Sequence, residues 1–176
     1  MSDRMFRSLW SGVFLAALAG CIEGGSRTTV NFGGTYRFIT EQVDLGCQEK
    51  STGVAISLSP LPRQEFTVEV TQDGSDILLY STEFDWNMIN MRVNAAADAG
   101  NTGGLTGKIA SDGSFYAETT SVWTGNGDAG PMEITQRLEG WFTGEGVSGT
   151  YFVKLFIINY NTECQGNSGF TGEKIS

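Results

Sequence analysis

Few residues in this sequence are of a type that could carry out covalent chemistry. The chain has no histidine, which excludes Ser-His-Asp and Cys-His catalysis, histidine-bound zinc and the usual general base near neutral pH. The chain has three cysteines, Cys21, Cys47 and Cys164. We therefore expect no enzyme and no catalytic residues, and the cysteines suggest covalent roles of another kind.

The first cysteine follows a segment with the features of an export signal. Arg4 and Arg7 precede a mostly apolar run from Leu9 to Ala19, and small residues lead from there to Cys21. A helix that crosses a bilayer permanently needs about 20 apolar residues, so this run is too short to remain as a membrane span. We expect residues 1–20 to be a signal peptide.

The quartet Leu18-Ala19-Gly20-Cys21 makes this expectation more specific. It resembles the lipobox of bacterial lipoproteins, and the resemblance implies that the cysteine is acylated and that the signal peptide is cut just before it. Ile22 follows the cysteine, which resembles the outer-membrane choice described for enteric bacteria. The alternative is an ordinary secretory signal with a chance cysteine. The expected location is the bacterial cell envelope, with the membrane as a partner through a lipid anchor on Cys21.

The remainder of the chain has the size and charge of one acidic domain. Residues 21–31 are rich in glycine, serine and threonine and predict a flexible tether, whereas residues 32–176 are long enough for a single domain with its own core. The formal net charge of the whole 176-residue chain is −9. Such a surface repels nucleic acid and suits a basic protein partner, although it is also a common means of remaining soluble.

The two cysteines of the domain predict a disulfide. Once Cys21 is assigned to the lipid, Cys47 and Cys164 form an even remainder in an oxidising compartment, where a pair is more plausible than two reactive thiols. The ring that they close covers most of the domain. The chain-entropy model assigns roughly 4–5 kcal/mol to a ring of this size, as an upper figure.

Oxygen-rich loops offer a second possible chemistry. Aspartate, asparagine and glycine cluster at residues 73–76, 98–101 and 126–128. Such loops can bind calcium, but none has the Asp-x-Asp-x-Asp-Gly spacing, and the same residues are common in tight turns. Paired carboxylates could support glycoside hydrolysis, but nothing in the sequence selects a pair. We expect no metal and no cofactor.

One hairpin can be placed from the sequence. Apolar and polar residues alternate from Glu65 to Thr71, which predicts a strand with one buried face. Asp73-Gly74 then predicts a two-residue turn of type I′, because both central positions of that turn need positive φ. Folding about this turn places Val70 opposite Ile77, so the two apolar faces coincide.

Roughly eight to ten such strands and little helix predict an all-β, antiparallel up-and-down sheet. We expect a closed or nearly closed barrel, because closure removes the two edge strands, with a β-sandwich as the alternative. The domain resembles a lipocalin-like barrel: Gly34-Thr35-Tyr36 opens the first strand, a meander follows, and a cysteine near the end ties back. The family's opening Gly-x-Trp has tyrosine here, and ligand residues are not carried over.

Two functions fit this architecture. The first is the binding of a small apolar ligand in the barrel, with Trp86, Trp123 and Trp141 as candidate ligand-binding residues at its mouth. The alternative is a protein-binding or inhibitory envelope lipoprotein that holds a basic protein on its acidic surface, as some lysozyme- and protease-inhibiting envelope barrels do. A structural envelope component is equally compatible with that second case. A tryptophan-lined cavity would favour the first function, and a filled interior the second.

Overall fold

The computed structural model describes residues 30–84, 104–123 and 130–176 of the 176-residue chain. The predicted signal peptide, Cys21, the first part of the predicted tether and Trp86 lie outside these residues. The described elements are β1 (Gly34–Thr40), β2 (Gly46–Glu49), β3 (Ala55–Ser57), β4 (Gln64–Asp73), β5 (Asp76–Tyr80), β6 (Gly104–Ile109), β7 (Ser114–Trp123), β8 (Met132–Phe142), β9 (Gly146–Ile157), the 3-10 turn η1 (Ile158–Tyr160) and β10 (Thr162–Lys174).

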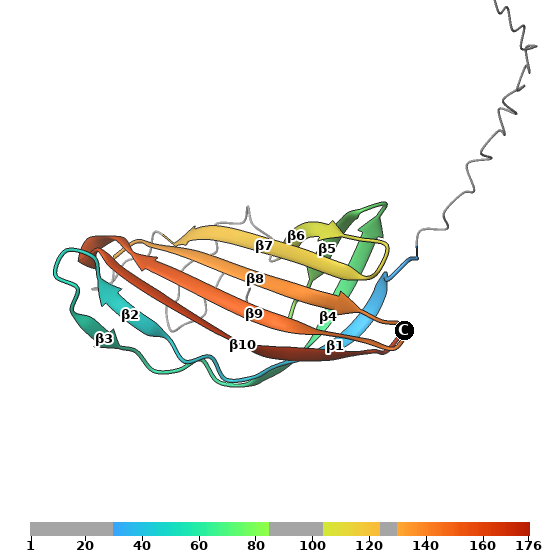
Figure 1. Cartoon of the computed structure of the whole chain (residues 1–176), viewed down its shortest axis with the longest axis horizontal. Coiled ribbons are helices and arrows are strands. Elements are labelled where there is room, and N and C mark those ends of the chain that lie inside the picture. The colour runs from blue at the N-terminus through green and yellow to red at the C-terminus, as the bar shows by residue number, and fades with distance from the viewer. Residues whose placement is uncertain (1–29, 85–103, 124–129) are drawn as a thin grey trace, which may run out of the picture.

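Eight of these strands form a closed antiparallel barrel, which confirms the barrel and not the sandwich. The neighbours run in the order β1-β4-β5-β6-β7-β8-β9-β10, and β10 pairs back with β1 (Figure 1). The hairpin β2–β3 interrupts the expected meander, since β2 pairs with the first residues of β10 while β1 pairs with the last ones. The strands β1 and β2 therefore follow each other along one edge of β10.

The two ends of the barrel differ. At one end, which we call the closed end, the described chain begins and finishes: Gln72 Nε2 donates to the Val30 carbonyl, and the Thr35 N–H donates to the Ser176 carbonyl at 2.7 Å. Phe32 is buried there, with its ring 5.8 Å from that of Phe142. The other end, which we call the mouth, carries the β2–β3 hairpin and the turn between β9 and β10 (Figure 1).

The β4–β5 hairpin is present, but its register differs from the prediction. Asp73 pairs with Asp76, so the central turn residues are Gly74 and Ser75, and only Gly74 has positive φ, at 60°. This arrangement fits a type II′ turn, which takes glycine first, and the type I′ prediction was wrong. Val70 consequently faces Leu79 and not Ile77. Because the shift is two residues, both apolar faces still point inward.

Candidate functional site

A disulfide bond joins Cys47 of β2 to Cys164 of β10, as the cysteine count predicted. The two residues are 117 positions apart in sequence and occupy directly paired positions in the sheet. Both are buried. The bond therefore ties the β2–β3 hairpin to the strand that closes the barrel, and it lies at the mouth.

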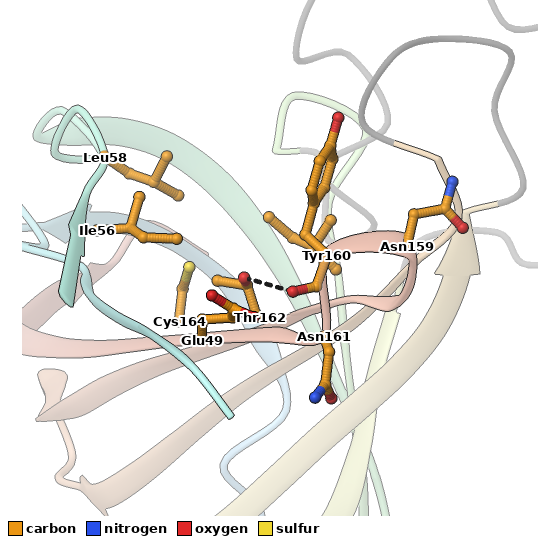
Figure 2. Close-up of a pocket in the computed structure, with 9 residues that line it drawn as sticks. Glu49, Ile56, Leu58, Asn159, Tyr160, Asn161, Thr162 and Cys164 are labelled. Carbon is orange, nitrogen blue, oxygen red and sulfur yellow. Dashed lines mark hydrogen bonds between the residues drawn. The ribbon is translucent and has the colours of Figure 1, made fainter. Parts of the chain in front are cut away.

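An apolar groove of about 520 Å³ lies beside this disulfide. Ile56 and Leu58 form one wall, Tyr160 stands on the opposite side, and Cys164 and Thr162 lie between them (Figure 2). The volume falls within the range of roughly 300–1,000 Å³ that is typical of small-ligand sites. The groove therefore has the size and the lining of a binding site for an apolar group.

The groove continues the inner face of the barrel. Ile56 pairs with Cys47, Cys164 pairs with Leu155, and Leu155 pairs with Ile134 in the neighbouring strand. Side chains at directly paired positions share one face of a sheet, so this row runs from the core to the mouth. Ile134 and Leu155 are buried, whereas Ile56 is 40% exposed. The apolar face thus becomes accessible at β3.

One carboxylate borders the groove. Glu49 accepts hydrogen bonds from the hydroxyl groups of Thr52, at 2.7 Å, and Ser51. The bond from Ser51, and then that from Thr52, lowers the pKa of the Glu49 carboxyl, which is therefore ionised near neutral pH. Among the described residues Glu49 has no Lys or Arg partner, whereas the nearby Glu163 has two, Lys50 at 2.8 Å and Lys154 at 3.1 Å.

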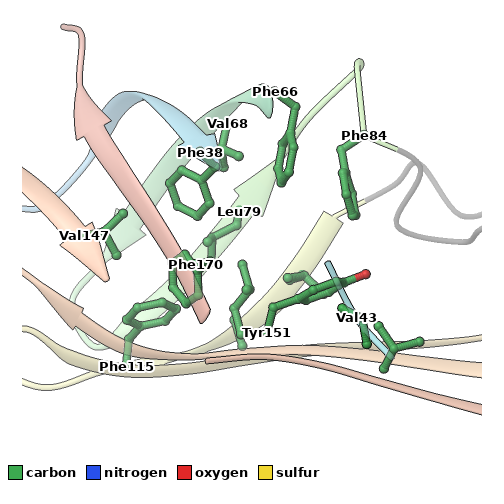
Figure 3. Close-up of a cluster of buried hydrophobic side chains, with 14 of the residues drawn as sticks. Phe38, Val43, Phe66, Val68, Leu79, Phe84, Phe115, Val147, Tyr151 and Phe170 are labelled. Carbon is green, nitrogen blue, oxygen red and sulfur yellow. The ribbon is translucent and has the colours of Figure 1, made fainter. Parts of the chain in front are cut away.

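Described side chains form a buried cluster in the interior behind the groove. Figure 3 shows aromatic and aliphatic groups from opposite sides of the barrel in one cluster. The Phe38 and Phe170 rings stack 5.5 Å apart, and Phe66 and Phe84 lie 4.1 Å apart. These packed rings make the described interior a core, so the groove at the mouth is the better candidate for a ligand.

A buried polar pair lies inside this core. The Tyr151 hydroxyl donates a hydrogen bond to Gln136 Oε1, and both side chains are almost completely buried. Burial strongly raises the pKa of the Tyr151 hydroxyl, which keeps it protonated and able to donate. The pair therefore satisfies two polar groups in an apolar surrounding, which is a structural role.

The predicted tryptophans do not form a common site among the described residues. Trp141 is 60% exposed and lies between buried Gly140 and Phe142 on β8, so it faces outward and does not line the interior. The alternation of side chains along a strand does not show which face of the strand points inward. The sequence therefore could not predict that the Trp141 side chain faces outward. The Trp123 backbone pairs with Met132 at the mouth end of β7, but its side chain lies outside the description, as does the whole of Trp86.

A second hollow, also of about 520 Å³, lies on the outer surface of the barrel. Leu78 and Tyr116 line it, beside the ion pair between Lys108 and Asp76 at 2.5 Å. Leu78 is 39% exposed and alternates with buried neighbours, so this hollow has no continuity with the core. It resembles the groove at the mouth in volume and in having an exposed leucine.

Within the described ranges, no group of three or more His, Cys, Asp or Glu residues could hold a metal ion. In the same part of the chain, no helix has the length and apolar character needed to cross a membrane.

No protein-family model matches the sequence, and no curated protein or solved structure matches it significantly.

Proposed function

We propose that this chain is a lipid-anchored binding protein of the bacterial cell envelope, and that it takes apolar groups of its ligand into the groove at the mouth. The observation that carries the binding role is the exposure of Ile56, Leu58 and Tyr160 around one apolar groove. Solvent-exposed aliphatic side chains gain about 25 cal/mol per Å² when a ligand covers them. The anchor and the envelope location rest on Leu18-Ala19-Gly20-Cys21.

The groove differs from the site first expected. Described core side chains occupy the barrel interior, whereas the groove is open to solvent, so the groove is the better entry point for a ligand. A protein ligand can use the same apolar surface as a small molecule. The acidic exterior, with a formal net charge of −9, supports a cationic ligand over an anionic one.

The binding role can be tested with the neutral fluorescent probe N-phenyl-1-naphthylamine and the purified mature protein. Leu58→Asn places an amide in the groove and is expected to weaken probe binding about tenfold. The matched control is Leu78→Asn in the outer hollow, since Leu78 and Leu58 are 39% and 40% exposed. Equal affinity of the Leu58→Asn variant and the parent protein, or loss of binding only with Leu78→Asn, would reject the groove.

The anchor can be tested separately in cells. Cys21→Ser removes the sulfur that an acyl chain would modify, so we expect the variant to leave the membrane fraction and to lose labelling by a clickable palmitate analogue. One acyl chain gives only marginal membrane binding, and the several chains of a lipoprotein give firm attachment. A Cys21→Ser variant that stays in the membrane fraction under high salt contradicts the anchor.

A further inference from the structure

The strand β3 has a free edge. Among the described strands it is the last of the sheet and pairs only with β2. The Glu49 N–H donates to the Val54 carbonyl at 3.0 Å, and in an antiparallel pair the residues that face the partner alternate with those that face away. Ala55 and Ser57 therefore direct their N–H and C=O groups away from β2. Both residues are exposed, and no described residue bonds to these groups.

The side chains of this edge are apolar and uncovered. Val54, Ile56 and Leu58 follow one another at alternate positions and are 58%, 40% and 40% exposed. Natural proteins usually protect an edge strand with a charged residue, a proline or a bulge. The three residues of β3 include no charged residue and no proline. Pro60 and Pro62 follow β3 in the chain. An uncovered edge beside an apolar groove has the composition of a strand-addition site.

We infer that the groove at the mouth receives an extended segment of a partner protein, which adds to the sheet as a strand beside β3. This inference rests on the proposed binding role of the groove. The added strand bonds to the outward backbone groups of Ala55 and Ser57, and its alternate side chains cover Ile56 and complete the wall of the groove. The affinity then comes from the main chain, and the specificity comes from the apolar side chains.

Charge selects the kind of partner. The whole chain carries a net charge of −9, so two copies repel each other and a second copy is a poor occupant of this edge. Glu49 pairs with Val54 across β2 and β3, borders the groove and lacks a cationic partner among the described residues. The partner segment therefore has apolar residues at alternate positions and lysine or arginine beside them.

The experiment selects nine-residue peptides from a random display library on the immobilised mature protein. We expect the selected sequences to alternate apolar residues and to carry Lys or Arg. Ala55→Pro removes the outward N–H of Ala55 and is tolerated at a sheet edge, so it should weaken these peptides at least tenfold. Ala55→Val keeps that N–H and is the matched control, for which we expect parent affinity.

A second measurement leaves the protein unchanged. The best peptide is resynthesised with N-methyl groups at alternate positions, in both registers, and one register should lose binding because it cannot donate to β3. Glu49→Gln should weaken the cationic peptide several-fold and reduce its dependence on salt.

The outcomes separate the two proposals. If the naphthylamine probe does not bind the parent protein at the groove, the proposed function fails. If the probe binds but the library gives no peptide, or if the selected peptides bind equally well to Ala55→Pro and tolerate both N-methyl registers, strand addition at β3 is wrong and the groove takes small apolar molecules only.

Discussion

Cys47 and Cys164 face each other at directly paired positions of β2 and β10, and a disulfide joins them. This bond is the covalent tie between the mouth hairpin and the strand that closes the barrel. Apart from this bond, β2 is held to β10 by only four residue pairs, Gly46–Glu49 with Thr162–Gln165. The wall of the groove therefore depends on the disulfide as well as on these few pairings.

Replacing both cysteines by serine is expected to lower the free energy of unfolding by up to about 4–5 kcal/mol, because the unfolded chain loses a constraint on 117 residues. Urea denaturation of the purified protein measures the change. As a check on the parent protein, alkylation without reduction should label neither Cys47 nor Cys164. Labelling of both residues would contradict the bond.

Gly149 lies where the chain leaves no room for a side chain. A Cβ at this position would collide with the Glu139 carbonyl oxygen and would lie 2.8 Å from Cε1 of Phe170. Gly149→Ala should therefore cost about 1–3 kcal/mol of stability, as overpacking of a core usually does. Gly169→Ala is the matched control, since its Cβ would meet nothing within 4 Å, and it should be neutral or slightly stabilising. Similar denaturation midpoints for both variants would be unexpected.

The buried Tyr151 hydroxyl should make the folded protein less stable at alkaline pH. Its pKa is raised by burial, so the folded state holds the proton above about pH 10, where an unfolded tyrosine releases it. The stabilisation is complete below the unfolded pKa and declines as the pH rises above it. Tyr151→Phe should remove this decline, while it lowers stability at neutral pH by about 1–3 kcal/mol through the lost bond to Gln136.

The measurement is the urea midpoint from about pH 9 to about pH 11. Tyr80→Phe is the control, because the Tyr80 hydroxyl makes no bond to a described residue. An equal alkaline decline in the Tyr151→Phe variant and the Tyr80→Phe variant would assign the effect to other groups.

The ion pairs of Glu163 should make a smaller contribution to stability, which is lost at acid pH. Hydrogen bonds from Lys50 and then Lys154 lower its pKa, so its contribution is complete above the ordinary glutamate pKa and is lost as the pH falls through the lower folded value. Glu163→Gln should therefore flatten the acid side of the stability profile, and about 1 M NaCl should do the same. Glu145→Gln, at an exposed carboxylate without a described ion pair, should leave the profile unchanged.

Periodicity and turn residues were sufficient to predict a closed antiparallel barrel and the β4–β5 hairpin, and the cysteine count predicted the disulfide. The strand β2 was missed, since Gly46–Glu49 contains one apolar side chain and shows no alternation. The strand β10 (Thr162–Lys174) is similarly hard to recognise, because it is defined by its neighbours β9, β1 and β2 more than by its own composition.

The groove could not be predicted, because its walls come from distant parts of the chain. The alternation of Val54, Ile56 and Leu58 predicts a strand, and the same pattern is typical of a buried one. Only the pairing of β3 with β2 and of β2 with β10 shows that this strand is an edge and that Tyr160 lies across from it. The sequence predicted a tryptophan-lined site, whereas the groove in the structure is lined by the exposed aliphatic residues of β3 and the segment after it.

The two ends of the described chain and the groove lie at opposite ends of the barrel. The described chain begins at the closed end, and the groove lies at the opposite end of strands such as β10, whose 13 residues span about 40 Å (Figure 1). With the proposed anchor on Cys21, the chain that leads from the lipid joins the barrel at the end away from the groove. A partner can then approach β3 without passing the point where the anchored segment enters the barrel.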